Sequence, residues 1–135
     1  MNRNDALMLS EAAIKAREKS YCPYSGFAVG AALLTEDGRI YTGANIESAS
    51  YTPTVCAERV AFFSAVHQGE RNFSAIAIAG GKATEAVSDF TPPCGVCRQV
   101  MTEFCKKDFN IILTNGNDIK IFTLAELFPE VFILN

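Results

Sequence analysis

The apolar segments of this chain alternate between strand-like and helix-like spacing, and this alternation constrains the fold more than any other feature. Residues 75–79 read Ala-Ile-Ala-Ile-Ala, a continuous apolar run that is typical of a strand buried on both faces of a sheet. Apolar segments long enough for helices flank this run, at residues 57–67 and 95–105. Alternating strands and helices predict a sheet that helices cover on both faces.

The remaining segments extend the same alternation to the whole chain. In order, we expect a helix over residues 5–19, strands over 27–34 and 39–45, a buried helix over 57–67, a strand over 75–79, a helix over 95–105, strands over 109–113 and 119–122, and a short helix over 124–128. The turn sequence Glu36-Asp37-Gly38 predicts a hairpin, which makes the sheet mixed. The sequence therefore predicts one α/β domain over residues 1–135, a three-layer α/β/α sandwich with a mixed five-stranded sheet.

Length, charge and cysteine content narrow the classes of function. A chain of 135 residues fits one domain, and no stretch approaches the roughly 18 apolar residues of a membrane span. The formal net charge of −3 argues against non-specific binding to nucleic acid and favours a small-molecule partner. The five cysteines are an odd number in a sequence without a secretory signal pattern, so we expect a cytoplasmic protein that uses thiols for metal binding or catalysis.

Two cysteine motifs open two of the predicted helices. The first is Cys56-Ala57-Glu58-Arg59, and the second, in residues 92–97, has the spacing Pro-Pro-Cys-x-x-Cys. The Cys-x-x-Cys spacing lets two sulfurs bind one cation, and a helix N-terminus favours the thiolate over the thiol. Three thiolates at two neighbouring helix starts predict a zinc site formed by Cys56, Cys94 and Cys97.

Two other interpretations of these cysteines have to be weighed. Cys94 and Cys97 alone could form a redox pair, although such motifs normally follow the first strand of their unit. A structural zinc site would need a fourth ligand, and the sequence positions of Cys22, His67 and Cys105 suit none of them for it. Three ligands leave one position open to water, which is typical of catalytic zinc. We expect Cys22 and Cys105 to be buried structural thiols.

Glu58 follows the first cysteine by two positions, in the first turn of a mostly apolar helix. A carboxylate there is costly to bury without a function. Beside a metal-activated water it can accept a proton and pass it on as general base and acid. The plain alternative is a carboxylate stabilised by the helix dipole, worth under about 1 kcal/mol.

At this point the chain resembles a known family, the zinc-dependent cytidine deaminases. The similarity runs through residues 21–32 (YCPYSGFAVGAA), 45–51 (NIESASY), 56–59 (CAER) and 93–99 (PCGVCRQ). The length and the three cysteines are similar to those of the small homotetrameric branch of that family. The resemblance implies the cytidine deaminase-like fold.

The resemblance also implies roles for the motif residues. Cys56, Cys94 and Cys97 would bind one Zn²⁺ per chain, and Glu58 would carry the proton. Three thiolates leave the zinc site with a net charge of −1, which weakens the metal as a Lewis acid, so a neighbouring guanidinium is useful. The resemblance gives this charge-neutralising part to Arg59, which otherwise fits an ordinary surface arginine.

The substrate contacts come from the resemblance alone. Asn45 and Glu47 would hold the ribose hydroxyls, Phe27 would line the pyrimidine pocket, and the backbone of Ala57 would face the base. By pattern alone, Asn45 is a strand end, Glu47 a solvated charge and Phe27 a core aromatic residue.

The resemblance further implies a homotetramer with shared active sites. Tyr51 and Phe132 are similar to residues that reach the site of a neighbouring subunit. The apolar tail over residues 128–134 fits a subunit contact, or packing on its own domain.

The implied reaction is hydrolytic deamination of cytidine and deoxycytidine to uridine and deoxyuridine, with release of ammonia, as in pyrimidine salvage. A deaminase of another cytosine compound, such as a blasticidin-type antibiotic, would share both metal motifs, but Asn45 and Glu47 suit a ribose. A nucleic-acid-editing deaminase would need a basic groove and stacking aromatic residues, and this chain is acidic and lacks Trp. A zinc-stabilised binding module would have a fourth protein ligand and no need for Glu58.

Overall fold

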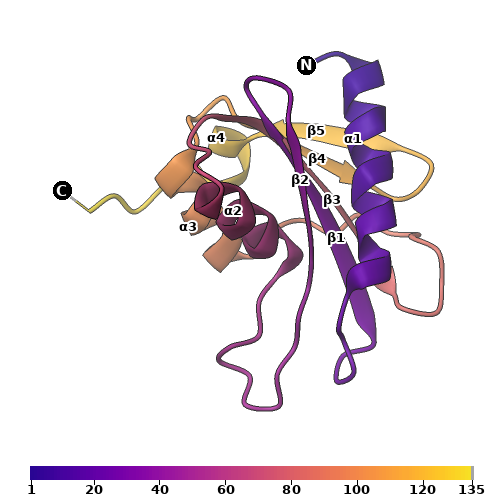
Figure 1. Cartoon of the computed structure of the whole chain (residues 1–135). Helices are drawn as coiled ribbons and strands as arrows, with labels where there is room; N and C mark the ends of the chain where they lie inside the picture. The colour runs from indigo at the N-terminus through magenta and orange to yellow at the C-terminus, as the bar shows by residue number, and fades with distance from the viewer. Residues whose placement is uncertain (135) are drawn as a thin grey trace.

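The five strands form one mixed sheet, in a computed structural model that describes residues 1–134. The strands are β1 (Phe27–Thr35), β2 (Ile40–Ala44), β3 (Phe73–Lys82), β4 (Asn110–Thr114) and β5 (Ile119–Thr123), in the spatial order β2-β1-β3-β4-β5 (Figure 1). Only the β3–β4 pair is parallel, and β1–β2, β1–β3 and β4–β5 are antiparallel. The predicted hairpin and mixed sheet are confirmed.

Helices cover both faces of this sheet. The helix α1 (Arg3–Ala16), continued by the short 3₁₀ helix η1 (Arg17–Lys19), lies on one face. On the other face lie α2 (Ala57–His67) and α3 (Gly95–Phe104), with the four-residue α4 (Leu124–Leu127) beside α3 (Figure 1). The predicted three-layer α/β/α sandwich is therefore confirmed.

The central strand β3 divides its side chains between the two faces. Its alanines, Ala75, Ala77 and Ala79, belong to the core cluster under α1, whereas Ile76 and Ile78 belong to the cluster under α2 and α3. All five are fully buried, as a central strand requires. Small residues on one face allow α1 to pack closely, and large residues on the other fill the space below α2 and α3.

Two glycines allow the helices to approach the sheet closely. A Cβ atom at Gly30 would lie 2.0 Å from the carbonyl oxygen of Ala13 on α1. At Gly43, a Cβ would lie 2.4 Å from the carbonyl oxygen of Ala57, the first residue of α2. Since no side chain fits there, Gly43 lets the start of α2, where the first cysteine motif lies, pack directly against β2.

Several expectations need correction. The strand predicted over residues 75–79 is twice as long, because β3 pairs along the full length of β1. The helix α2 is not buried all round, since Phe63 is 49% exposed. Cys22 and Cys105 are only partly buried, because Cys22 lies in a surface loop and Cys105 ends α3.

None of the helices in residues 1–134 is both long and apolar enough to cross a membrane.

Candidate metal centre and active site

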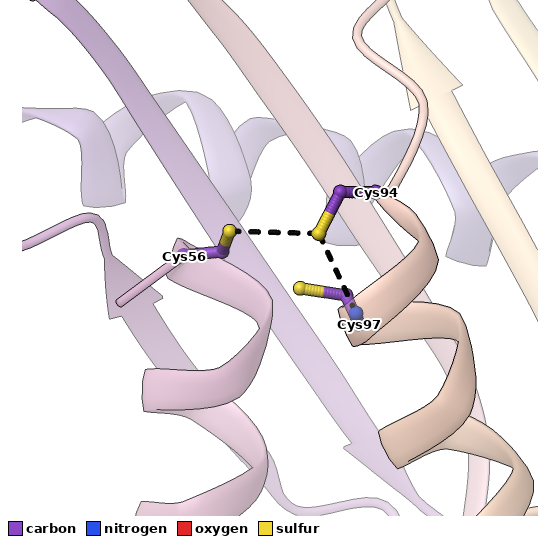
Figure 2. A group of neighbouring side chains, drawn as sticks. All are labelled: Cys56, Cys94 and Cys97. Carbon is purple, nitrogen blue, oxygen red and sulfur yellow. Dashed lines mark hydrogen bonds between the residues drawn. The ribbon is translucent and has the colours of Figure 1, made fainter. Parts of the chain in front are cut away.

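The sulfurs of Cys56, Cys94 and Cys97 converge between the first turns of α2 and α3. Cys56 and Cys94 are the N-caps of the two helices, and Cys97 lies in the first turn of α3 (Figure 2). The three sulfurs lie within 4.8 Å of one another, and those of Cys56 and Cys94 are 3.8 Å apart. Two sulfurs bound tetrahedrally to one zinc ion at about 2.3 Å lie about 3.8 Å apart, so the spacing fits Zn²⁺.

The cluster bears on both alternative interpretations of the cysteines. In the part of the chain that the structure describes, the group contains these three ligands and no fourth His, Cys, Asp or Glu. The described residues thus lack the fourth protein ligand that a structural zinc site needs. Cys94 and Cys97 are also not an isolated pair, because Cys56 faces Cys94 from the neighbouring helix.

The thiols of Cys56 and Cys97 shift each other's pKa in opposite directions when no metal is bound. The hydrogen bond with Cys97, together with Arg59, lowers the pKa of Cys56 to about 5, although partial burial opposes the shift. The same hydrogen bond, burial and the charge of Glu58 raise the pKa of Cys97. Cys56 is thus the thiol that ionises first and Cys97 keeps its proton, which a divalent cation would displace on binding.

Glu58 lies one residue inside α2 and is only 4% exposed. Burial raises its pKa from 4.5 to about 7, and the neighbouring Cys56 thiolate acts in the same direction. A carboxyl group with a pKa near neutrality can both accept and donate protons at physiological pH.

Arg59 lies in the first turn of α2, next to Cys56. Its Nη2 donates a hydrogen bond to the Cys56 Sγ over 3.4 Å. Burial acts to lower the pKa of Arg59, but the Cys56 and Cys97 sulfurs outweigh it and the pKa is raised. Its Nε is buried and has no hydrogen-bond partner within residues 1–134. A fixed guanidinium thus lies against the thiolate cluster.

One cavity of about 330 Å³ joins this cluster to the predicted substrate residues. Its wall is formed by Ser25, Phe27, Val29, Asn45, Glu47, Thr54, Val55, Cys56, Ala57, Glu58, Thr91, Pro92 and Cys94. All four predicted substrate-contact residues are therefore brought together with Glu58 and two of the predicted zinc ligands. The volume lies within the range of small-molecule sites.

Asn45 and Glu47 are held by hydrogen bonds within the protein. The Asn45 amide oxygen accepts from Val29 N and from the Ser20 hydroxyl, and its nitrogen donates to the Phe27 carbonyl. The Glu47 carboxylate accepts from the loop before β1, and the Ser25 hydroxyl and backbone lower its pKa. Both side chains are therefore fixed at the cavity wall.

Tyr51 and Phe132, the two residues predicted to reach a neighbouring subunit's site, lie in different surroundings. Tyr51 is 79% exposed and lines a second cavity of about 320 Å³, which shares Ser25, Glu47 and Thr54 with the first. Its φ of 62° is unusual for an aromatic residue. Phe132 is 64% exposed, and Gln99 on α3 binds its carbonyl. Their contacts with another subunit stay a prediction.

The sequence did not single out several residues of the cavity wall. Ser25, Val29 and Pro92 lie within motif segments but carried no prediction, and Thr54 and Thr91 lie in loops. Loop residues show no periodicity, so no pattern could have identified the last two.

The family model described as "Cytidine and deoxycytidylate deaminase zinc-binding region" matches residues 3–113 of the chain. This protein belongs to that deaminase family. A curated cytidine deaminase of Sporosarcina psychrophila is 52% identical over 119 residues, covering 87% of this chain and 84% of the relative. The crystal structure of cytidine deaminase from Burkholderia pseudomallei covers 98% of this chain and 100% of its own, with 44% identity and a TM-score of 0.85.

The chain is also similar to a protein named for the activity of the alternative prediction. A Blasticidin-S deaminase of Bacillus cereus is 34% identical over 110 residues, covering 79% of this chain and 78% of that protein. The chain is thus more similar to the cytidine deaminase of Sporosarcina psychrophila than to this antibiotic deaminase. The family model is one of a zinc-binding region, and the cysteine cluster fits that metal.

Proposed function

We propose that the protein catalyses the zinc-dependent hydrolytic deamination of cytidine and deoxycytidine to uridine and deoxyuridine, with release of ammonia. The observation that carries this proposal is one cavity whose wall contains two chemically different groups of side chains. One group is Cys56, Cys94 and the buried Glu58, and the other is Asn45 and Glu47. An aminopyrimidine matches the first group and a sugar matches the second.

Zinc held by Cys56, Cys94 and Cys97 supplies Lewis-acid activation of the attacking water when it is bound. Arg59 compensates the excess negative charge of three thiolates through its contact with Cys56. In support, the Nε of Arg59 is a buried donor beside the cluster.

Glu58 carries the protons of the reaction. It accepts a proton from the attacking water and delivers it to N3 of the cytosine ring, which makes C4 more electrophilic. After the C4–O bond has formed, Glu58 takes a second proton from the new C4 hydroxyl and passes it to the amino nitrogen. The C4–N bond then breaks, C4 becomes a carbonyl and ammonia leaves. The burial of Glu58 beside Cys56 supports this role, because it keeps the carboxyl poised between its two protonation states.

The remaining wall residues hold the substrate in place. Phe27 packs against the pyrimidine ring, and the backbone of Ala57 faces the polar edge of the base. Asn45 and Glu47 bind the sugar hydroxyls, where charge-assisted hydrogen bonds are the stronger kind. Their position in the same cavity as Glu58 supports these roles.

The cavity wall supports a free nucleoside as the substrate. Among residues 1–134 no Lys or Arg lines it that could pair with phosphate groups, and the whole chain has a net charge of −3. The cavity wall therefore does not form a basic groove that could bind a polymeric nucleic acid. A blasticidin-type antibiotic is the alternative substrate, and the sugar-binding pair Asn45 and Glu47 argues against it.

Assembly and cellular role extend the proposal. We infer a homotetramer in which Tyr51 and Phe132 reach a neighbouring subunit's site. Exposed apolar side chains on α2 and in the C-terminal tail, such as Phe63 and Leu134, support such contacts. Free thiols at all five cysteines fit a reducing cytoplasm, where the product would serve pyrimidine salvage. Sedimentation that gives a stable, fully active monomer would contradict the shared site.

The direct test measures ammonia release from cytidine and deoxycytidine by purified protein with its zinc content determined. We expect turnover with about one zinc per chain. Bound zinc without turnover on either nucleoside would point to another cytosine compound, and blasticidin S is then the substrate to assay. Absence of both zinc and turnover would favour redox chemistry at Cys94 and Cys97.

A further inference from the structure

The Glu47 carboxylate is bound at both oxygens by the loop that precedes β1. Its Oε1 accepts hydrogen bonds from the backbone N–H groups of Tyr24 and Ser25, each 3.0 Å long. Its Oε2 accepts a hydrogen bond from the Ser25 hydroxyl. Ser25 is thus the one residue within residues 1–134 that binds both carboxylate oxygens.

The direction of the Ser25 hydroxyl is also fixed. The backbone N–H of Phe27 donates to Ser25 Oγ over 3.0 Å, which occupies a lone pair of that oxygen. The hydroxyl hydrogen is then left to point at Glu47, and the alternative acceptor, the Phe27 carbonyl, is 3.5 Å away. A hydroxyl oriented in this way holds its acceptor in one rotamer.

The loop that carries Ser25 is itself tied to the segment that carries Glu47. Tyr21 N donates to the Asn45 carbonyl, and Glu47 N donates to the Tyr21 carbonyl, each over 2.9 Å. Gly26, at a φ of 67°, closes the turn with a 3.0 Å bond from its N–H to the Cys22 carbonyl. The two segments therefore present Ser25 to Glu47 as one unit.

These bonds decide what Glu47 can still offer to a substrate. Two backbone donors occupy Oε1, and Ser25 takes part of the capacity of Oε2, which leaves an acceptor site on Oε2 alone. The Ser25 hydroxyl, followed by the backbone N–H groups, holds the pKa of Glu47 below its usual value, so the carboxylate is charged at neutral pH. Without the Ser25 hydroxyl, Oε2 has no donor within residues 1–134, and the carboxylate is free to turn about its two remaining bonds at Oε1.

Resting on the proposed function, we propose that Ser25 is a positioning residue that locks the Glu47 carboxylate in the orientation that binds a sugar hydroxyl of the nucleoside. It acts through Glu47 and not on the reacting base. Its loss therefore weakens substrate binding and leaves the chemical step unchanged.

The test compares wild-type protein with Ser25→Ala, Glu47→Ala and the double variant. We expect Ser25→Ala to raise KM for cytidine about tenfold, the size expected for a hydrogen bond to a charged group, with kcat within about twofold. In the Glu47→Ala background the same change should have almost no further effect on KM. With 2′,3′-dideoxycytidine, which lacks the 2′- and 3′-hydroxyls and keeps the 5′-hydroxyl, the effect of Ser25→Ala should disappear.

The matched control is Ser50→Ala. Ser50 is another exposed loop serine, and among the described residues the only hydrogen bond of its hydroxyl is with the Ser48 hydroxyl, over an Oγ-to-Oγ distance of 3.1 Å. Its KM should equal that of the wild type. Ser25→Cys keeps the shape of the side chain with a weak donor, and it carries the test if Ser25→Ala does not fold. An unchanged KM in folded Ser25→Ala would overturn the proposal. So would a double variant in which the KM increases of Ser25→Ala and Glu47→Ala multiply. A wild type that fails to deaminate any cytidine would instead overturn the proposed function.

Discussion

The Nη2 of Arg59 donates a hydrogen bond to the Sγ of Cys56 over 3.4 Å, from one turn further along the same helix. Because Cys56 is the N-cap of α2 and Arg59 lies in its first turn, their relative position is set by the start of the helix and does not depend on a distant loop. The cation and the helix N-terminus both stabilise the Cys56 thiolate. One short sequence motif thus supplies a metal ligand together with the charge that compensates it.

We predict that Arg59→Gln weakens zinc binding by about 10- to 100-fold, because it removes the hydrogen bond and the positive charge beside the ligand. The measurement is competition for zinc with a chelator of known affinity. Arg71→Gln is the matched control, since Arg71 is exposed and bonds only backbone carbonyls near the end of α2. Equal zinc affinities in both variants would show that Arg59 does not stabilise the metal-bound thiolates.

Glu58→Gln should slow turnover by about 10²-fold or more, since the amide has the shape of the carboxyl but cannot transfer protons. Zinc content and melting temperature should stay near those of the wild type. Glu11→Gln, on the exposed side of α1 across the sheet, should leave kcat unchanged. Near-normal turnover of Glu58→Gln would remove Glu58 from the mechanism.

Glu58 should also make the stability of the metal-free protein depend on pH. Its pKa is about 7 in the folded state and near 4.5 when unfolded, so the folded protein binds the extra proton between these values. The stabilisation is complete below about pH 4.5 and is lost as the pH rises through 7, by up to about 3 kcal/mol.

Urea unfolding of chelator-treated protein at pH 5 and pH 8 measures this effect. The wild type should lose stability relative to Glu58→Gln between the two pH values, and the comparison removes the part of the cysteine titration that does not depend on the charge of Glu58. A constant difference would mean that the buried Glu58 carboxyl does not gain a proton on folding.

The sequence was sufficient for those features that local periodicity and motif spacing determine. The apolar run over residues 75–79 indicated a central strand because burial on both faces leaves no polar positions. The convergence of Cys56 with the pair Cys94 and Cys97 followed from their positions at two helix starts, once those helices shared a face of the sheet. The full length of β3 did not follow, because its last residues include Gly80 and Gly81, which are typical of a strand end.

The cavity wall depends on tertiary contacts that no local pattern encodes. Thr91 has neither periodic spacing nor a motif, and it reaches the cavity because its loop runs beside β3. Phe27 was assigned to the pocket by family resemblance alone, and the structure gives a physical reason for its position. Both side chains occupy the space that is left open by the missing side chain of Gly80.

Gly80 gives the last prediction, which concerns the shape of the cavity. A Cβ atom at this buried position would lie 2.6 Å from Thr91 Oγ1 and 3.0 Å from Cε2 of the Phe27 ring. Gly80→Ala should therefore push both side chains into the cavity and raise KM for cytidine about tenfold, with zinc content retained because the cysteines are not displaced. Steady-state kinetics combined with zinc analysis of the variant checks this. An unchanged KM would mean that Thr91 and Phe27 can give way without narrowing the cavity, and loss of zinc would mean that the disturbance reaches the cysteine cluster.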